Sequence, residues 1–128
     1  MDKEKNVCLT EKKKGFGFRP TVYICSPYRG DVEKNTERAR RYSALAVERK
    51  AIPYAPHLLF PQFMHEKTDR DRLLALFMGQ VMLDKCAEVW VFGENITEGM
   101  KGEIERAQMR KKVIRYFTEN GKEVKANE

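Results

Sequence analysis

The sequence of 128 residues has little of what would assign it to several common classes of protein. No apolar run approaches the roughly 20 residues that a membrane-spanning helix needs, and residues 1–6 lack the apolar stretch of a secretory signal. There are only three cysteines, without a Cys-x-x-Cys pair, and two histidines. We therefore expect reduced thiols, no metal site and a cytoplasmic location.

What the chain does have suits one compact domain. Hydrophobic residues make up 41% and charged residues 34%, and the net charge is +6. This charge could favour nucleic acid, phosphorylated ligands or only solubility. Because the lysines of residues 1–20 are mixed with acids and lack an aromatic platform, we expect the charge to serve solubility and not to bind nucleic acid. We expect a polar arm over 1–20, a domain over 21–117 and a polar tail over 118–128.

Strand-like and helix-like segments alternate along the chain. Short β-branched and aromatic runs predict strands at 21–25, 52–55, 89–92 and 113–117. Helical periodicity predicts helices near 31–50, over 69–85 and from 97 onward. The alternation predicts an α/β fold, a parallel sheet with helices on both faces. In the helix over 69–85 we expect a buried stripe of Leu73, Leu74, Phe77, Val81 and Met82. The apolar segment 56–63 is expected to be a loop that covers the core or walls a pocket.

Two polar loops follow the first and third predicted strands. They are the segment 26–31, SPYRGD, and the segment 95–100, NITEGM. Ligands bind at the carboxyl ends of such strands, where the strand order reverses. If these two strands are neighbours, the crevice between the loops holds Tyr28, Arg29, Thr97, Gly99 and Glu103.

Glu103 is the residue in this crevice that most needs an explanation. It shares a helix face with apolar Met100 and Ala107, where a carboxylate costs free energy unless it is paired or lines a cleft. It could act as a nucleophile, a base or an acceptor for a ribose hydroxyl. Arg29 suits a phosphate or carboxylate, and Thr97 begins a helix whose free amides attract anions. The structural alternative is that Arg29 pairs with Asp31, and Glu103 with Lys101 or Lys111.

Two motifs resemble the nucleoside 2-deoxyribosyltransferase-like superfamily, which includes deoxynucleoside 5′-monophosphate N-glycosidases. The segment 26–30, SPYRG, is similar to the family's turn of small residues followed by Arg-Gly. The segment 97–107, TEGMKGEIERA, is similar to its Ser-x-Gly-x-x-x-Glu pattern, with an alanine four residues after the Glu. The resemblance spans about residues 21–117.

The resemblance implies a flavodoxin-like, Rossmann-like three-layer fold with four to five strands, and an enzyme without a cofactor. Glu103 would be the nucleophile that displaces the base from the sugar, and Tyr28 would orient it. The substrate, a nucleoside or nucleotide, would contact residues of both loops and the histidine after the second strand: Ser26, Arg29, Gly30, His57, Thr97, Gly99 and Met100. The resemblance also implies a homodimer.

The chain departs from the family at one position. The family places an aspartate on the second helix, eight residues before the acid that opens the third strand, and here that position is Gln80. Glutamine does not exchange a proton at neutral pH, so either Asp84 or His57 assists the leaving base, or the base departs without such help and slowly. The alternative is a catalytically silent nucleotide-binding module.

Overall fold

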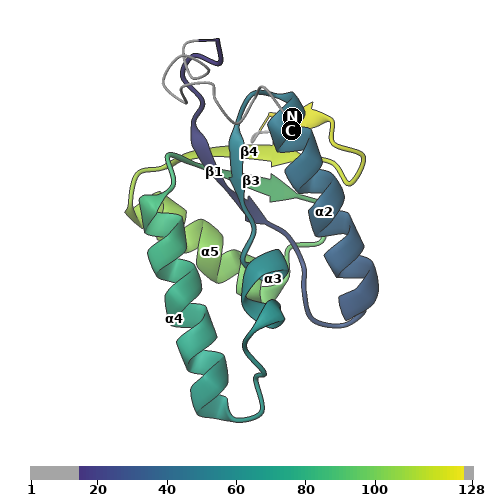
Figure 1. Cartoon of the computed structure of the whole chain (residues 1–128), viewed down its shortest axis with the longest axis vertical. Helices are drawn as coiled ribbons and strands as arrows, with labels where there is room; N and C mark the ends of the chain where they lie inside the picture. Colours follow the sequence, from purple (N-terminus) through teal and green to yellow (C-terminus); the bar gives the residue numbers. More distant parts are fainter. Residues whose placement is uncertain (1–14, 126–128) are drawn as a thin grey trace, which may run out of the picture.

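The computed structural model describes residues 15–125 and contains one five-stranded sheet (Figure 1). The strand order is β2-β1-β3-β4-β5, in which neighbouring strands are parallel except for the antiparallel pair of β4 and β5. The strands are β1 (Thr21–Cys25), β2 (Ile52–Tyr54), β3 (Glu88–Phe92), β4 (Val113–Phe117) and β5 (Glu123–Val124). The predicted parallel sheet is confirmed, and the order of its first four strands is that of flavodoxin-like folds.

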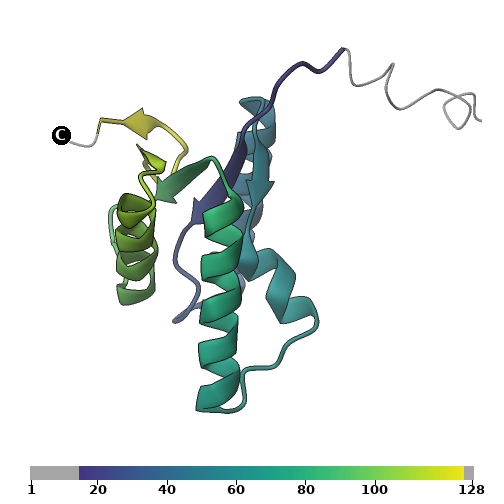
Figure 2. The ribbon, with the colours of Figure 1, turned by 90° about the vertical axis from the view of Figure 1, so that its left-hand side faces the viewer.

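Helices cover both faces of the sheet. They are α2 (Val32–Glu48), α3 (Pro56–Leu59), α4 (Asp69–Lys85) and α5 (Glu98–Met109), with a 3-10 turn at Phe60–Gln62. Figures 1 and 2 show α2 on one face and α4 and α5 on the other. In both views the N-terminal half of α4 projects beyond the ends of the strands. No helix in the described part of the chain is long and apolar enough to cross a membrane.

Each face of the sheet has its own apolar core, because side chains alternate along a strand. On β1, Val22 and Ile24 pack under α2, in a cluster that also contains Trp90 of β3. Tyr23 and Cys25 face the opposite way and pack under α4 and α5. This second cluster delivers a hydroxyl and a thiol to the helix that carries Glu103.

The starts of α2 and α4 are fixed by side-chain caps. Asp31 is the N-cap of α2 and accepts a hydrogen bond from the Lys34 amide at 3.1 Å. Thr68 caps α4 in the same way, through the Asp71 amide at 3.1 Å. These caps satisfy amides that have no partner inside the helix and set where each helix begins.

The predicted buried stripe of α4 is wrong for four of its five residues. Leu73 is 66% exposed and Phe77 60% exposed, and Leu74 and Val81 are also exposed, whereas Met82 packs against the core. The residues that α4 buries are Gly79 and Leu83. The sequence pattern could not choose between the faces because α4 is apolar on both.

Three short elements were not predicted. The segment expected to be a loop over 56–63 forms α3 and the 3-10 turn, with Pro56 in the first helical turn, where its missing amide costs nothing. Near the C-terminus, β5 pairs with β4 through Tyr116 and Phe117. Its two residues are too few to give a strand pattern in the sequence.

Candidate functional site

The two polar loops follow neighbouring strands, because β1 and β3 are adjacent in the sheet. Cys25 at the end of β1 is in register with Val91 of β3, and the strand order reverses between these two strands. The reversal of strand order therefore lies at the two strands between which the sequence predicts the crevice.

Glu103 lies on α5 at this crevice and is held by two side chains of β1. The Tyr23 hydroxyl donates a hydrogen bond to Oε2 of Glu103. The Cys25 thiol lies 3.5 Å from Oε1. Since both donors point from one face of β1, the strand fixes the carboxylate in position and orientation.

The surroundings raise the pKa of Glu103 from 4.5 to about 7. Burial is the main cause, because it disfavours the charged carboxylate, while the hydrogen bonds from Tyr23 and Cys25 act in the opposite direction. Burial and the charge of Glu103 in turn raise the pKa of Tyr23 and of Cys25, so both remain protonated donors. A carboxylate poised near neutrality is typical of a group that does chemistry.

The start of α5 is capped and partly exposed. Thr97 is the N-cap, and its hydroxyl oxygen accepts a hydrogen bond from the Met100 amide at 3.2 Å. Thr97 and Gly99 are exposed, whereas the Met100 side chain is buried in the core. The positive end of the helix dipole therefore lies about one helical turn from Glu103.

Two hydrogen bonds from Asn35 of α2 hold the loop after β1. This buried side chain donates to the carbonyl oxygens of Tyr28, at 3.1 Å, and Arg29, at 3.2 Å. Gly30 adopts a φ of 98°, a backbone conformation that favours glycine and lets the loop turn into α2. The hydrogen bonds from Asn35 and the backbone conformation of Gly30 therefore fix the shape of this loop.

His57 of α3 packs against the same loop. Its ring stacks on Tyr28 with centroids 4.7 Å apart, and its Nε2 lies 3.1 Å from the carbonyl oxygen of Ser26. A carbonyl oxygen only accepts, so Nε2 carries the proton. Burial lowers the pKa of His57. The Ser26 hydroxyl is buried and has no hydrogen-bond partner within residues 15–125.

The pairings of the structural alternative do not form. Arg29 pairs with Glu66 at 3.2 Å and not with Asp31. Lys101 pairs with Glu98 at 3.2 Å, and the hydrogen bonds of Glu103 within the described chain are those to Tyr23 and Cys25. The Arg29–Glu66 pair is exposed, so a bound anion can displace Glu66 at little cost.

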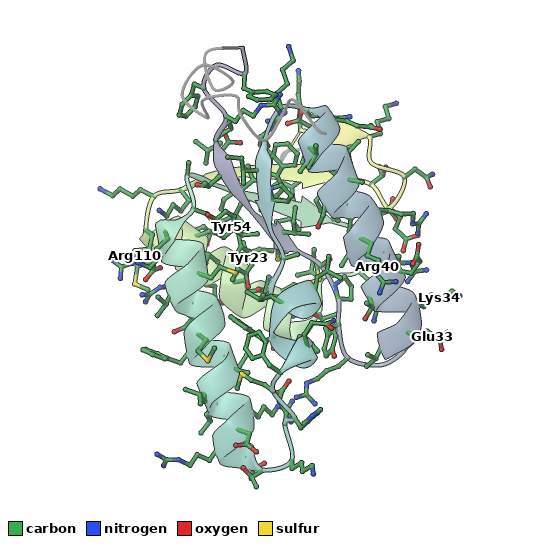
Figure 3. The ribbon with its side chains drawn as sticks, viewed as in Figure 1. Tyr23, Glu33, Lys34, Arg40, Tyr54 and Arg110 are labelled. Carbon is green, nitrogen blue, oxygen red and sulfur yellow. The ribbon has the colours of Figure 1, made fainter. Side chains whose placement is uncertain are left out.

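Asp84, the predicted acid, is engaged elsewhere. Arg106 binds both of its carboxylate oxygens, at 2.9 Å and 2.6 Å, and Arg110 adds a third contact at 3.1 Å. These hydrogen bonds lower the pKa of Asp84. In Figure 3, Arg110 lies at the outer edge of the molecule, whereas Tyr23 lies in its interior. Asp84 thus joins α4 to the last turns of α5. Gln80, one helical turn earlier, is exposed.

Sequence reasoning missed Tyr23, Cys25 and Asn35. The hydroxyl that reaches Glu103 belongs to Tyr23, not to Tyr28 as the resemblance implied. The alternation along β1 places Tyr23 and Cys25 on one face, which was a usable signal. Which face α5 covers, however, depends on the sheet order.

A separate depression lies at the ends of β3 and β4. It has a volume of about 540 Å³ and is lined by Glu94, Asn95, Thr118, Glu119, Asn120 and Lys122. It contains none of the predicted site residues. None of its acidic side chains is hydrogen-bonded to Glu103, so the depression is separate from the Glu103 site.

Comparisons with known proteins agree with this fold. The model of a family described as a domain of unknown function, DUF7768, matches residues 20–117. No curated protein matches in a sequence search. Among solved structures, a 2-deoxyribosyltransferase from Bacillus psychrosaccharolyticus superposes with a TM-score of 0.64 at 11% identity, over 77% of this chain and 72% of that one. A Leishmania mexicana 2-deoxyribosyltransferase gives 0.54 at 16% identity, over 77% of this chain and 64% of its own length. The fold therefore resembles 2-deoxyribosyltransferases.

Proposed function

The chain belongs to the DUF7768 family, and from its fold and the Glu103 site we propose that it cleaves the N-glycosidic bond of a nucleoside or nucleotide. The observation that carries the proposal is the half-buried carboxylate of Glu103, held by Tyr23 and Cys25 of β1. The similar solved structures are of 2-deoxyribosyltransferases. The proposed enzyme uses no cofactor.

The proposed reaction has two steps. Glu103 attacks the anomeric carbon of the sugar, the bond from that carbon to the base nitrogen breaks, and the electron pair leaves with the base. A covalent glycosyl ester forms, and water or a second base then displaces the carboxylate. A carboxylate suits both steps because it stabilises the positive charge of the transition state and is itself a good leaving group.

The two anion-binding features favour a 5′-monophosphate over an unmodified nucleoside. In this proposal the phosphate binds to Arg29 and to the amides of α5 near Thr97 and Gly99, and Tyr28 lies beside the sugar. Arg29 exchanges Glu66 for the phosphate. Gly30 and Ser26 shape the loop, His57 supports Tyr28 by stacking, and Met100 anchors the first turn of α5 in the core.

A second candidate function is binding without turnover, which Gln80 favours. Asp84 is held by two arginines and His57 donates its Nε2 proton to a carbonyl oxygen, so neither is placed to protonate a leaving base. In the proposed enzyme the base takes its proton from water, and turnover is slow. In a silent module the same site holds the nucleotide intact.

A screen for free base distinguishes the two functions. The purified chain is incubated with the common ribo- and deoxyribonucleosides and their monophosphates, base is measured by chromatography, and thermal shifts are recorded on the same samples. Base release from any of them supports the enzyme. A thermal shift without base release supports the silent module, and neither signal contradicts both.

The rate of base release is expected to rise with pH and to level off above about pH 7. The pKa of Glu103 is about 7, and only the ionised carboxylate attacks the sugar. Activity is therefore lost as pH falls through that value, about tenfold per unit. The measurement is kcat/KM against pH, with an unphosphorylated nucleoside included because a phosphate titrates near pH 6. A flat profile from pH 5 to 9 would contradict the assignment.

We also propose that the protein is a homodimer that pairs through α4. Leu76 and Phe77 lie three and four positions after Leu73, and Val81 lies four positions after Phe77, so these exposed residues form one stripe along the helix. A helix that is apolar on both faces is usually buried on both. A second α4 packed antiparallel about a two-fold axis would cover both stripes at once.

The substitution Phe77→Glu is expected to convert this dimer into a monomer. The substitution places a negative charge in the centre of each stripe. The two-fold axis brings the charges of the two subunits close together, where they repel each other. The molar mass measured by sedimentation or light scattering should fall from twice 15.0 kDa to 15.0 kDa. Val47→Glu is the matched control, because Val47 is an exposed apolar residue on α2. A monomeric wild-type chain would refute the interface.

A further inference from the structure

The two oxygens of Glu103 have different hydrogen-bond donors. Oε2 accepts from the Tyr23 hydroxyl, and Oε1 faces the Cys25 thiol at 3.5 Å. A hydroxyl is a strong donor and a thiol a weak one. Because Oε1 has the weaker donor, it keeps more of the negative charge of the carboxylate and a more available lone pair.

We propose that Cys25 is a positioning residue, whose thiol holds Oε1 of Glu103 by a weak hydrogen bond and so leaves that oxygen as the nucleophile. The proposal rests on the proposed function, in which Glu103 attacks a sugar. Oε1 forms the new bond to the anomeric carbon, the bond from carbon to base nitrogen breaks with its electron pair on the base, and the base gains a proton from water.

The thiol also has a second acceptor for its single proton. The carbonyl oxygen of Met100 lies 3.9 Å from the Cys25 sulfur. When Oε1 becomes part of an ester it is a poorer acceptor, and the thiol proton can turn toward Met100. A hydroxyl at this position would hold Oε1 more tightly and would have to give up a stronger bond in the reaction.

Cys25 itself is not placed to react. It is fully buried, and burial together with the charge of Glu103 raises the pKa of its thiol, so the thiolate form is suppressed. Its effect is therefore confined to the carboxylate that it touches.

The test compares Cys25→Ser and Cys25→Ala, in the full chain, by carbon-13 NMR titration of the Glu103 carboxyl group. The serine hydroxyl is the stronger donor to the carboxylate and should lower the pKa of Glu103 by roughly 0.5–1 unit, whereas alanine donates nothing and should raise it by a similar amount. Cys86→Ser is the matched control, because Cys86 is equally buried in the same cluster but is not hydrogen-bonded to Glu103. A change in packing alone does not move the pKa in opposite directions.

Activity gives the second measurement. On the plateau of the pH profile, Cys25→Ser should lower kcat roughly threefold to tenfold, because a less basic oxygen is the weaker nucleophile. A Glu103 pKa that is unchanged, or that moves the same way in both variants, would overturn the proposal. Opposite pKa shifts in the two variants, together with a wild-type chain that releases no base, would uphold the Cys25 contact and overturn the proposed function instead.

Discussion

Glu103→Gln is expected to abolish base release, with a loss of at least about a thousandfold in kcat, because the amide cannot form the glycosyl ester. The size and the hydrogen-bonding reach of the side chain are kept, so substrate should still bind. The measurement is a single-turnover assay of base release together with a thermal shift on the same ligand. Retained base release in this variant would eliminate Glu103 as the nucleophile.

The same substitution is expected to stabilise the fold at alkaline pH. The pKa of Glu103 is about 7 in the folded chain and 4.5 as the ordinary value, so the folded state binds the proton more tightly than the unfolded state. Wild-type stability therefore falls as pH rises from about 4.5 to 7, by about 3 kcal/mol at most. Glutamine removes this cost, and its advantage should be present at pH 8 and absent at pH 4.

Glu105→Gln is the matched control for both measurements. Glu105 lies two residues along α5 and is exposed, as its place on the helix predicts. Neutralising it should change neither base release nor the pH dependence of stability. A gain in stability that appears in both variants would point to the overall charge of α5 and not to the buried carboxylate.

The sequence predicts the fold well because its local signals agree with one another. The bounds of α4 match the prediction at both ends, since Thr68 caps its start and the apolar pattern stops at Lys85. The alternation of strands and helices predicts a parallel sheet, but the pairing of β1 with β3 entered the prediction only as a condition, which the structure meets.

The partners of individual side chains could not be predicted in the same way. Arg29 has carboxylates close in sequence, yet it pairs with Glu66, 37 residues away, because the segment before α4 returns to the β1 loop. Asp84 is drawn to Arg106 and Arg110 by the packing of α4 on α5. Such contacts depend on the three-dimensional path of the chain and leave no local pattern.

Tyr23→Phe is expected to lower kcat about a hundredfold at neutral pH. The phenyl ring keeps the packing under α4, but Oε2 of Glu103 loses its hydroxyl donor in a buried site. The pKa of Glu103 should then rise above 7, so that less of it is ionised, and the carboxylate is free to rotate away from the sugar. The measurement is the pH profile of kcat/KM, in which the point of half-maximal activity should move to higher pH.

Tyr42→Phe separates this effect from a general loss of packing. Tyr42 is also a buried tyrosine, but it belongs to the cluster on the opposite face of the sheet. Its substitution should leave the pH profile unchanged. If Tyr23→Phe instead lowers kcat equally at every pH, Tyr23 orients the carboxylate without tuning its charge. An unaltered kcat would remove Tyr23 from the site and leave the Cys25 thiol as the contact that fixes Glu103.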